Sequence, residues 1–320
     1  MGRLNGSSRV ATAALVALMA LTVVLVAMAL RSTHISGIDT SPVNTATASI
    51  NSNRATGSPS STPSATSSTT ATATAATVAA APLQTILVAL DNQRAWRVRV
   101  GSCAGGGAKV ATTTDGGKTW ADAKAPLRTI VRVRPTDSQA AFVVGAGSSC
   151  AAELKSTSNG GGTWGSTSDV GSAWFRDPKN PNAVGAPGSS TSQPCGPRAV
   201  LDLAVLSPST ARVLCDDGLV RSTTDTAASW ADSGRAAGAV ALAVASASPA
   251  QTYVALLDAA GCAGVQVRRV DQAAATSCIK AAVPKEPGQI ALSLVNGGGW
   301  LAVGDTTMRS TDGLATWSVS

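Results

Sequence analysis

The chain has 320 residues and a formal net charge of +7, and 44% of its residues are hydrophobic while only 3% are aromatic and 13% are charged. Because an average soluble domain is roughly 25% charged, this composition is not that of an ordinary cytosolic enzyme. The 31 glycines show no three-residue period, which excludes a collagen.

Residues 10–30 form the first predicted element, an uncharged run dominated by Ala, Val, Leu and Met. At about 1.5 Å per helical residue, such a run spans the roughly 30 Å hydrocarbon layer, so we predict a transmembrane helix. Two arginines precede it and one follows, a bias that places residues 1–9 in the cytoplasm and everything after the run outside it. The alternative is secretion after signal-peptide cleavage, because Ala27-Met28-Ala29 fits the small-x-small pattern of a cleavage site.

Residues 31–82 are dominated by Ser, Thr, Ala and Pro. Such a stretch cannot bury enough apolar surface to offset the entropy lost on ordering, so we predict a disordered, low-complexity stalk. As a random coil it would reach on the order of 40 Å, which holds a domain clear of the membrane.

Residues 83–320 contain an eight-residue repeat of the form S/T-x-D-G-x-x-T-W. Residues 113–120 and 310–317 match it at every fixed position, residues 157–164 replace the Asp by Asn, and residues 223–230 have lost the glycines. With Asp271 as a fifth, degenerate marker, the spacings of the acid position are 44, 66, 46 and 41 residues. A period of about 40–50 residues is the span of one four-stranded propeller blade.

Short runs rich in Val, Ile and Leu precede each copy in pairs, and turn residues separate them. No window shows a convincing amphipathic helical period. We therefore predict an all-β fold, a propeller of five or six four-stranded blades. An additional pair of runs at residues 172–188, inside the 66-residue interval, indicates either a sixth blade without its outer hairpin or a large insertion.

The octapeptide suits a structural role as a hairpin clamp. Its carboxylate accepts hydrogen bonds from the turn that it heads, its glycines permit positive φ, and its indole ring packs between neighbouring sheets. The residues predicted to do this are Asp115, Trp120, Asn159, Trp164, Asp225, Trp230, Asp312 and Trp317.

On these motifs, residues 83–320 resemble the Asp-box, or BNR-repeat, β-propellers, a family with a sialidase-like fold that also includes sortilin-type receptors and photosystem II assembly factors. The resemblance implies the fold but no activity, because the boxes of that family lie at the blade periphery, away from the central site. The chain is more similar to the non-catalytic branch of assembly factors than to true sialidases.

A sialidase would need a tyrosine nucleophile paired with a glutamate, together with an arginine triad, as the resemblance implies. Tyr253 is the only tyrosine, lies in a predicted second strand, and is expected to be a packed strand residue. The nearest match to the F/Y-R-I-P signature, residues 175–178, follows the second box instead of preceding the first, and is better explained as the end of an inner strand. The only glutamates are Glu153 and Glu286, and no pair of aspartates is convincing as the two carboxyl groups of another glycosidase.

Other catalytic motifs are missing from the exported segment. The single histidine, His34, precedes the stalk, which excludes a serine-histidine hydrolase. The sequence contains no phosphate-binding loop and no metal-spaced His/Cys cluster. We therefore predict no catalytic residue, no cofactor and no metal site, and we favour a protein without enzymatic activity over an enzyme.

Four arginines alternate along two predicted strands, so that each pair points to one face of its sheet. They are Arg97, Arg99, Arg132 and Arg134. They indicate either an anionic-ligand site near the propeller axis or a solvated sheet face. Nucleic acid is not expected as a partner, because the location is outside the cytoplasm and the charge surplus is small.

The six cysteines all lie in the predicted exported part, and an even number there argues for disulfides. Cys262 and Cys278 flank the hairpin that has lost its box, so we predict that a disulfide replaces the box as its brace. Pairing of Cys195 with Cys215 and of Cys103 with Cys150 follows by elimination.

The sequence thus predicts a membrane-anchored, extracytoplasmic β-propeller that acts as a binding or assembly scaffold at the cell envelope, with an envelope protein or glycan as partner. The alternative is a carbohydrate-active protein, either a glycan binder or a divergent exo-sialidase. Arginines that converge with an acid and Tyr253 at one mouth of the axis would favour the alternative, whereas an apolar or small-residue axis would favour the scaffold.

Overall fold

The computed structural model describes residues 80–245, 249–257, 259–284 and 286–320. The predicted membrane span at 10–30 and nearly all of the predicted stalk lie outside these residues. Among the residues described, no helix is long and apolar enough to cross a membrane.

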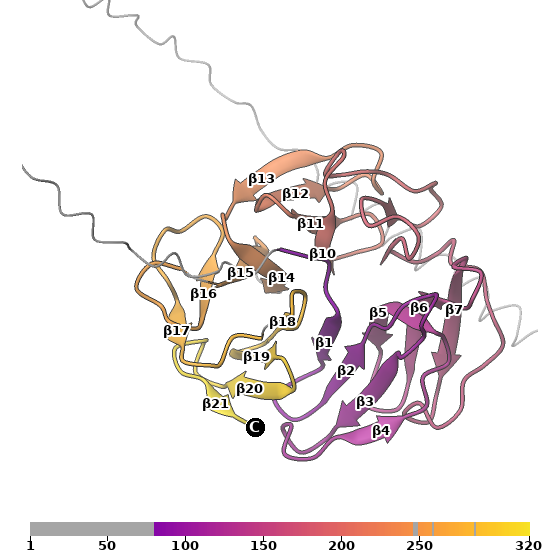
Figure 1. Ribbon diagram of the computed structural model, residues 1–320, viewed down its shortest axis with the longest axis horizontal. Coiled ribbons are helices and arrows are strands. Elements are labelled where there is room, and N and C mark those ends of the chain that lie inside the picture. Colours follow the sequence, from indigo (N-terminus) through magenta and orange to yellow (C-terminus); the bar gives the residue numbers. More distant parts are fainter. Residues whose placement is uncertain (1–79, 246–248, 258, 285) are drawn as a thin grey trace, which may run out of the picture. The chain divides into compact units, whose positions relative to one another are not determined.

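Six antiparallel sheets form a ring around a common axis (Figure 1). The chain builds them in sequence order, and the first strand of each sheet lies nearest the axis. The first strands β1, β5, β8, β10, β14 and β18 contact one another in this order, and β18 contacts β1 to close the ring. The described part of the chain is therefore an all-β propeller, as the strand pattern predicts.

The strand bounds follow the short Val-, Ile- and Leu-rich runs of the sequence. The four-stranded sheets are β1–β4 (Thr85–Ala89, Ala95–Arg99, Lys109–Thr113, Ala121–Ala123), β10–β13 (Val200–Val205, Ala211–Cys215, Leu219–Thr223, Ala231–Arg235), β14–β17 (Ala239–Ala245, Gln251–Leu257, Val265–Arg269, Ser277–Ile279) and β18–β21 (Ile290–Val295, Gly298–Val303, Thr306–Ser310, Ser318–Val319). The smaller sheets are β5–β7 (Thr129–Pro135, Ala141–Ala146, Ala152–Thr157) and β8–β9 (Phe175–Arg176, Val184–Gly185).

The expectation of four strands in every blade is wrong for the two smaller sheets. Beyond β7 the pairing continues only as one bridge between Leu154 and Ser168, and beyond β9 only as one bridge between Val184 and Ser192. The segments 165–173 and 186–199 are rich in Gly, Ser and Pro and lack the alternating β-branched residues that fill a strand. Five sheets of three or four strands are thus full blades, and the long interval in the repeat holds a two-stranded sheet that has its own place in the ring.

The four octapeptide turns lie on one face of the ring, which we call the turn face. Each bonds through its backbone to the turn that follows the first strand of the same blade. The N–H groups of Gly116, Gly160, Thr226 and Gly313 donate to the carbonyls of Gln93, Gln139, Ser209 and Gly297, at 2.8, 2.7, 2.9 and 2.9 Å.

Within each octapeptide turn, the acid or amide side chain ties the two ends of the turn together. At Asp115, one carboxylate oxygen accepts from the N–H of Thr119 at 3.0 Å and from the hydroxyl of Thr113 at 2.8 Å. The other oxygen accepts from the Thr119 hydroxyl at 2.6 Å. These hydrogen bonds lower the pKa of Asp115 to about 2, with the Thr119 hydroxyl as the main cause.

The tryptophan that ends each octapeptide contacts the preceding sheet of the ring. The indole N–H groups of Trp164, Trp230 and Trp317 donate to the Lys124 carbonyl and to the hydroxyls of Ser192 and Ser277. Trp120 meets the Trp300 ring edge-on, with ring centroids 6.4 Å apart. The octapeptide thus joins a turn within one sheet to packing between two sheets.

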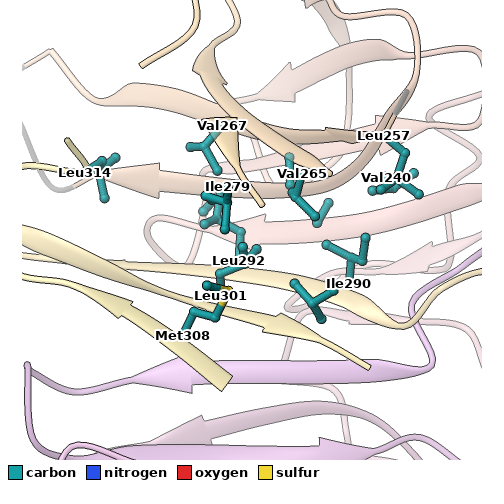
Figure 2. Packing of buried hydrophobic residues seen from close by; sticks show 14 of the residues in the cluster. Val240, Leu257, Val265, Val267, Ile279, Ile290, Leu292, Leu301, Met308 and Leu314 are labelled. Atoms are coloured by element: carbon teal, nitrogen blue, oxygen red, sulfur yellow. The ribbon is translucent and has the colours of Figure 1, made fainter. Parts of the chain in front are cut away.

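The hydrophobic core lies between neighbouring sheets (Figure 2). In its largest cluster, Val265, Val267 and Ile279 of one sheet face Leu292 and Leu301 of the next. These side chains are at most 5% exposed, and burial of each aliphatic side chain contributes about 1.5–3 kcal/mol.

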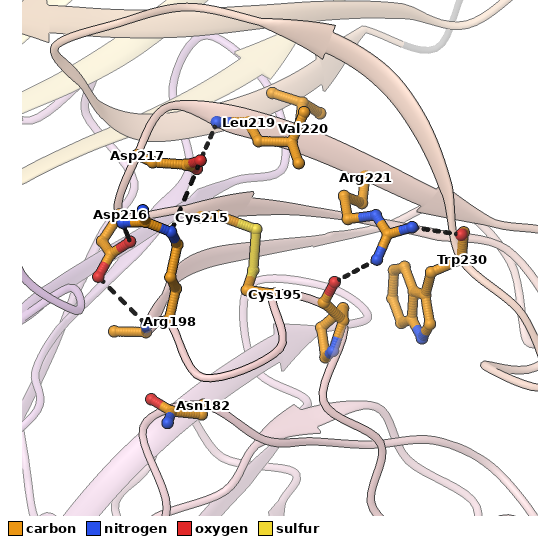
Figure 3. Close-up of a disulfide and its surroundings, with 12 residues drawn as sticks. Asn182, Cys195, Arg198, Cys215, Asp216, Asp217, Leu219, Val220, Arg221 and Trp230 are labelled. Carbon is orange, nitrogen blue, oxygen red and sulfur yellow. Dashed lines mark hydrogen bonds and ion pairs between the residues drawn. A yellow bond between two sulfur atoms is a disulfide. The ribbon is translucent and has the colours of Figure 1, made fainter.

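Three disulfides brace the opposite face, the disulfide face, where the second and third strands of the blades are joined. They link Cys103 to Cys150, Cys195 to Cys215, and Cys262 to Cys278. The predicted presence of disulfides is therefore confirmed, and the pairs are those inferred from the sequence. Cys262–Cys278 spans the hairpin without an octapeptide turn, while Cys195–Cys215 holds the loop after the two-stranded sheet against β11 (Figure 3).

Candidate functional site

The first strands converge on an axial cavity of about 500 Å³. All six sheets contribute to its wall, and most of the lining is aliphatic. The partly exposed Val, Leu and Ile residues of the wall are Ile86, Val88, Val131, Leu203, Val205, Leu206, Val244 and Leu294. A concave, mainly apolar site with a few converging polar groups is the usual form of a ligand pocket.

The chain itself closes the cavity at the disulfide face. Before it enters β1, the backbone N–H of Leu83 donates to Leu201 in the sheet across the ring, and the N–H of Gln84 donates to Gly288 beside β18. The Leu83 side chain lines the cavity and is only 4% exposed. The cavity is therefore blind at this end, and its other end extends to Pro135 and Pro208 at the turn face.

The two-stranded sheet makes one side of the cavity differ from the others. Its strand β8 runs from the turn face to the disulfide face, which is the direction of the second strand in the other sheets. Its turn, which begins at Asp177, contacts Cys103 and Val200 at the disulfide face, whereas the turns after β1, β5 and β10 lie at the turn face. The indole N–H of Trp174 donates to the carbonyl of Pro208 in the next sheet at 2.9 Å. In the same way, Trp300 of a regular second strand donates to the next sheet, to the carbonyl of Asp91 at 2.9 Å.

Among the residues that the structure describes, no strand pairs with the edge of β8 that faces the axis, and the side chain of an arginine occupies part of the space there. The guanidinium of Arg132, on β5, donates to the carbonyl of Trp174. Burial lowers the pKa of Arg132 to about 10, and the charge of Arg134 adds to the effect. Both guanidinium groups lie over the Phe142 ring, at 5.6 and 5.9 Å from its centroid.

A buried pair of opposite charges lies near the blind end of the cavity. Arg176 is 7% exposed and donates to the carbonyl of Leu83 at 3.1 Å. Asp202 is 9% exposed and accepts from the backbone N–H groups of Leu203 at 2.7 Å and Leu242 at 2.8 Å. Burial raises the pKa of Asp202 and lowers the pKa of Arg176, and the attraction between the two opposes both shifts.

Of the four arginines singled out in the sequence, the structure brings two to the axis. Arg132 and Arg134 line the cavity. Arg97 and Arg99 do not, because β2 is the second strand of its sheet and lies one strand farther from the axis. They point to the neighbouring sheet, where Arg97 donates to the Thr307 hydroxyl at 3.1 Å and Arg99 pairs with Asp305 at 2.7 Å. The Arg97 guanidinium also lies 4.4 Å from the centroid of the Trp120 ring of its own sheet.

Tyr253 does not take part in this site. It lies on β15, packs against a core cluster and donates its hydroxyl to Gln251 at 3.1 Å. Residues 175–178 are the whole of β8 and the start of its turn, so they lie in a strand next to the axis as expected, although this strand runs opposite to the other first strands.

Sequence reasoning missed Arg176, Asp202 and Leu83. Arg176 lies in the F-R-D-P segment, which sequence reasoning explained as the end of an inner strand without assigning a role to its arginine, although a strand next to the axis was a usable signal. Asp202 breaks the apolar pattern of its strand, and that interruption was the second available signal.

A larger groove of about 940 Å³ lies beside β14 and β16. Its two charged lining residues are already engaged, since Arg268 donates to the Gln272 carbonyl at 2.6 Å and Asp271 pairs with Arg269. The remaining lining is largely alanine and other aliphatic residues. No group of free charges converges there among the described residues, so the axial cavity is the better candidate site.

No family model matches this sequence, and no curated protein sequence matches it. Among solved structures, the chain is similar to YCF48 bound to D1 peptide, with 16% identity, coverage of 76% of this chain and 86% of that chain, and a TM-score of 0.29. It is also similar to the GH74 xyloglucanase from Xanthomonas campestris, with 14% identity, coverage of 73% and 38%, and a TM-score of 0.30. The six-bladed lectin of Aleuria aurantia shows 12% identity, coverage of 74% and 93%, and a TM-score of 0.47. These similarities concern the fold.

Proposed function

We propose that the protein is an extracytoplasmic Asp-box β-propeller that acts as a binding scaffold at the cell envelope, anchored through residues 10–30 and a stalk at 31–82. The observation that carries the binding role is the axial cavity, which is blind at the disulfide face. The opening of the cavity lies at the turn face, beside Pro135 and Pro208, where a partner can reach it.

The composition of the cavity supports binding over catalysis. Glycoside hydrolysis by the usual mechanism requires two carboxyl groups across the bond to be cut, and Asp202 is the single carboxyl group among the described residues of the lining. Both oxygens of Asp202 accept hydrogen bonds from the backbone, so this carboxylate holds the strands in place. Tyr253, the candidate nucleophile of a sialidase, does not line the cavity.

The second candidate function is glycan binding, which the three arginines of the cavity favour if the glycan is acidic. The aliphatic wall argues against it, because a sugar presents hydroxyl groups on most of its carbon atoms and each needs a hydrogen-bond partner when it is buried. Two of the three described serines in the lining already accept hydrogen bonds from the backbone: Ser207 from the N–H groups of Ser209 and Thr210, and Ser293 from the N–H of Ala89. The third is Ser172.

The test is a pull-down from envelope extract with full-length protein, run in parallel with a fluorogenic sialoside assay. We expect a specific partner to be retained by the wild type and by Arg99→Gln, and lost from Ser172→Trp, whose exposed side chain lines the cavity mouth. Retention of the same partner by Ser172→Trp, or hydrolysis of the sialoside that Ser172→Trp abolishes, would contradict the proposal.

A further inference from the structure

The chemistry of the axial cavity defines the class of ligand that it fits, an inference that rests on the proposed binding function. We propose that the cavity binds a carboxylate carried on an aliphatic group, with the carboxylate at Arg134 near the mouth and the aliphatic part in the depth of the cavity. Such a group is presented by a free aliphatic acid or by the C-terminus of a peptide that ends in an aliphatic residue.

The positive charge in the cavity exceeds the negative charge. Arg132, Arg134 and Arg176 line it, and Asp202 is the single acidic residue in the part of the lining that the structure describes. Among the described residues, none of the ion pairs involves these three arginines. The cavity therefore attracts an anion.

The arginines differ in how far their donors are already used. Arg132 donates to the Trp174 carbonyl and Arg176 donates to the Leu83 carbonyl. Arg134 is exposed and makes no hydrogen bond to the described residues, and its guanidinium contacts the face of Phe142. Its donors are free for a bidentate bond to a carboxylate, the geometry that a guanidinium favours.

The position of Arg134 sets the orientation of the ligand. It stands one residue before the end of β5, and its strand runs from the disulfide face to the turn face, so Arg134 lies near the mouth. Deeper in the cavity the lining residues Leu83, Leu87, Leu242 and Leu292 are at most 5% exposed. A carboxylate held at the mouth thus directs an attached aliphatic group towards these leucines.

Binding to full-length protein is measured by isothermal titration calorimetry with hexanoate, octanoate, octanol and glucuronate, for the wild type and two matched arginine variants. We expect octanoate to bind about tenfold more tightly than hexanoate, because each buried methylene contributes about 0.8 kcal/mol and 1.4 kcal/mol corresponds to tenfold. Octanol should bind at least tenfold more weakly than octanoate, since it lacks the charged hydrogen bond. Arg134→Gln should remove this preference without affecting octanol, whereas Arg99→Gln, which lies outside the cavity, should change neither.

Two peptides separate the sources of the carboxylate: a tripeptide that ends in leucine, as the free acid and as the amide. Tighter binding of the free acid than of octanoate assigns the site to a peptide C-terminus, and the reverse assigns it to a free acid. Equal affinity for octanol and octanoate, no effect of Arg134→Gln, or a preference for glucuronate would overturn the inference. If none of these ligands binds but Ser172→Trp still loses the envelope partner, the inference fails and the proposed function stands. If the envelope partner is retained by Ser172→Trp as well, the proposed function fails.

Discussion

The octapeptide turn at residues 223–230 keeps its geometry without the two glycines of the intact copies. Thr226 and Ala227 adopt φ values of 60° and 67°, where Gly116 and Gly117 adopt 79° and 88°. The side chains still make the same bonds, since Asp225 accepts from the Ser229 N–H at 3.0 Å. A β-branched residue at positive φ is strained, so Thr226→Gly is expected to stabilise the protein.

The magnitude follows from two opposing terms. The left-handed conformation costs a residue with a Cβ roughly 1–2 kcal/mol, while glycine adds about 0.4–1 kcal/mol of freedom to the unfolded chain. The Thr226 carbonyl keeps its bond from the Ser189 hydroxyl, because the backbone is unchanged. We expect a net gain of about 0.5–1 kcal/mol, which for a domain of this size raises Tm by about 1–4 °C. Ala227→Gly should gain less, because the Ala227 side chain packs against a core cluster.

Thermal unfolding followed by circular dichroism measures this effect, with Gly313→Ala as the matched control. Gly313 has a φ of 71°, and a Cβ there would meet no atom within 4 Å, so the control isolates backbone strain. It should lower Tm by an amount similar to the rise in Thr226→Gly. A fall in Tm for Thr226→Gly, or no change for Gly313→Ala, would refute the argument from backbone strain.

Three further predictions concern the other stabilising features. Asp115→Asn should flatten the pH dependence of the free energy of unfolding between pH about 4 and about 2. The pKa of Asp115 falls from 3.8 to about 2 on folding. The contribution of the Asp115 carboxylate to stability is therefore complete above pH about 4 and is lost as the pH drops towards about 2. Urea unfolding across this range checks it, and an unchanged slope would contradict it. Replacing Cys262 and Cys278 by Ser should cost about 3 kcal/mol, as expected for a 16-residue separation, and an unchanged urea midpoint would contradict the bracing role. Arg176→Met should cost about 3–5 kcal/mol at pH 7 because it leaves Asp202 buried without its counterion, and the loss should shrink as the pH falls and Asp202 becomes protonated; a loss independent of pH would contradict the pairing.

The propeller could be predicted from the sequence because its determinants are local. The octapeptide specifies its own turn through contacts four residues apart, as between Asp115 and Thr119, and the strands follow from short apolar runs. The disulfide across Cys262 and Cys278 was predictable for the same reason, since the two residues flank one hairpin.

The axial site was predictable only in part, because it depends on how strands are ordered between the axis and the rim. Alternation along a strand placed Arg132 and Arg134 on one face, but it did not distinguish them from Arg97 and Arg99, which lie one strand farther out. The reversed direction of β8 leaves a gap at the axis that Arg132 fills, and the crossing of Leu83 closes the cavity; both depend on contacts between residues far apart in the sequence.

The most direct test of the central claim, that the axial cavity is the binding site, is site-specific photo-crosslinking in envelope preparations. A photo-reactive residue is placed either at Ser172, in the lining of the cavity, or at Lys280, an exposed residue outside it. We predict a specific cross-linked product from position 172 that disappears with Arg134→Gln, and none from position 280. A product of the same intensity from position 280, or one from position 172 that Arg134→Gln leaves unchanged, would contradict the assignment of the axial cavity.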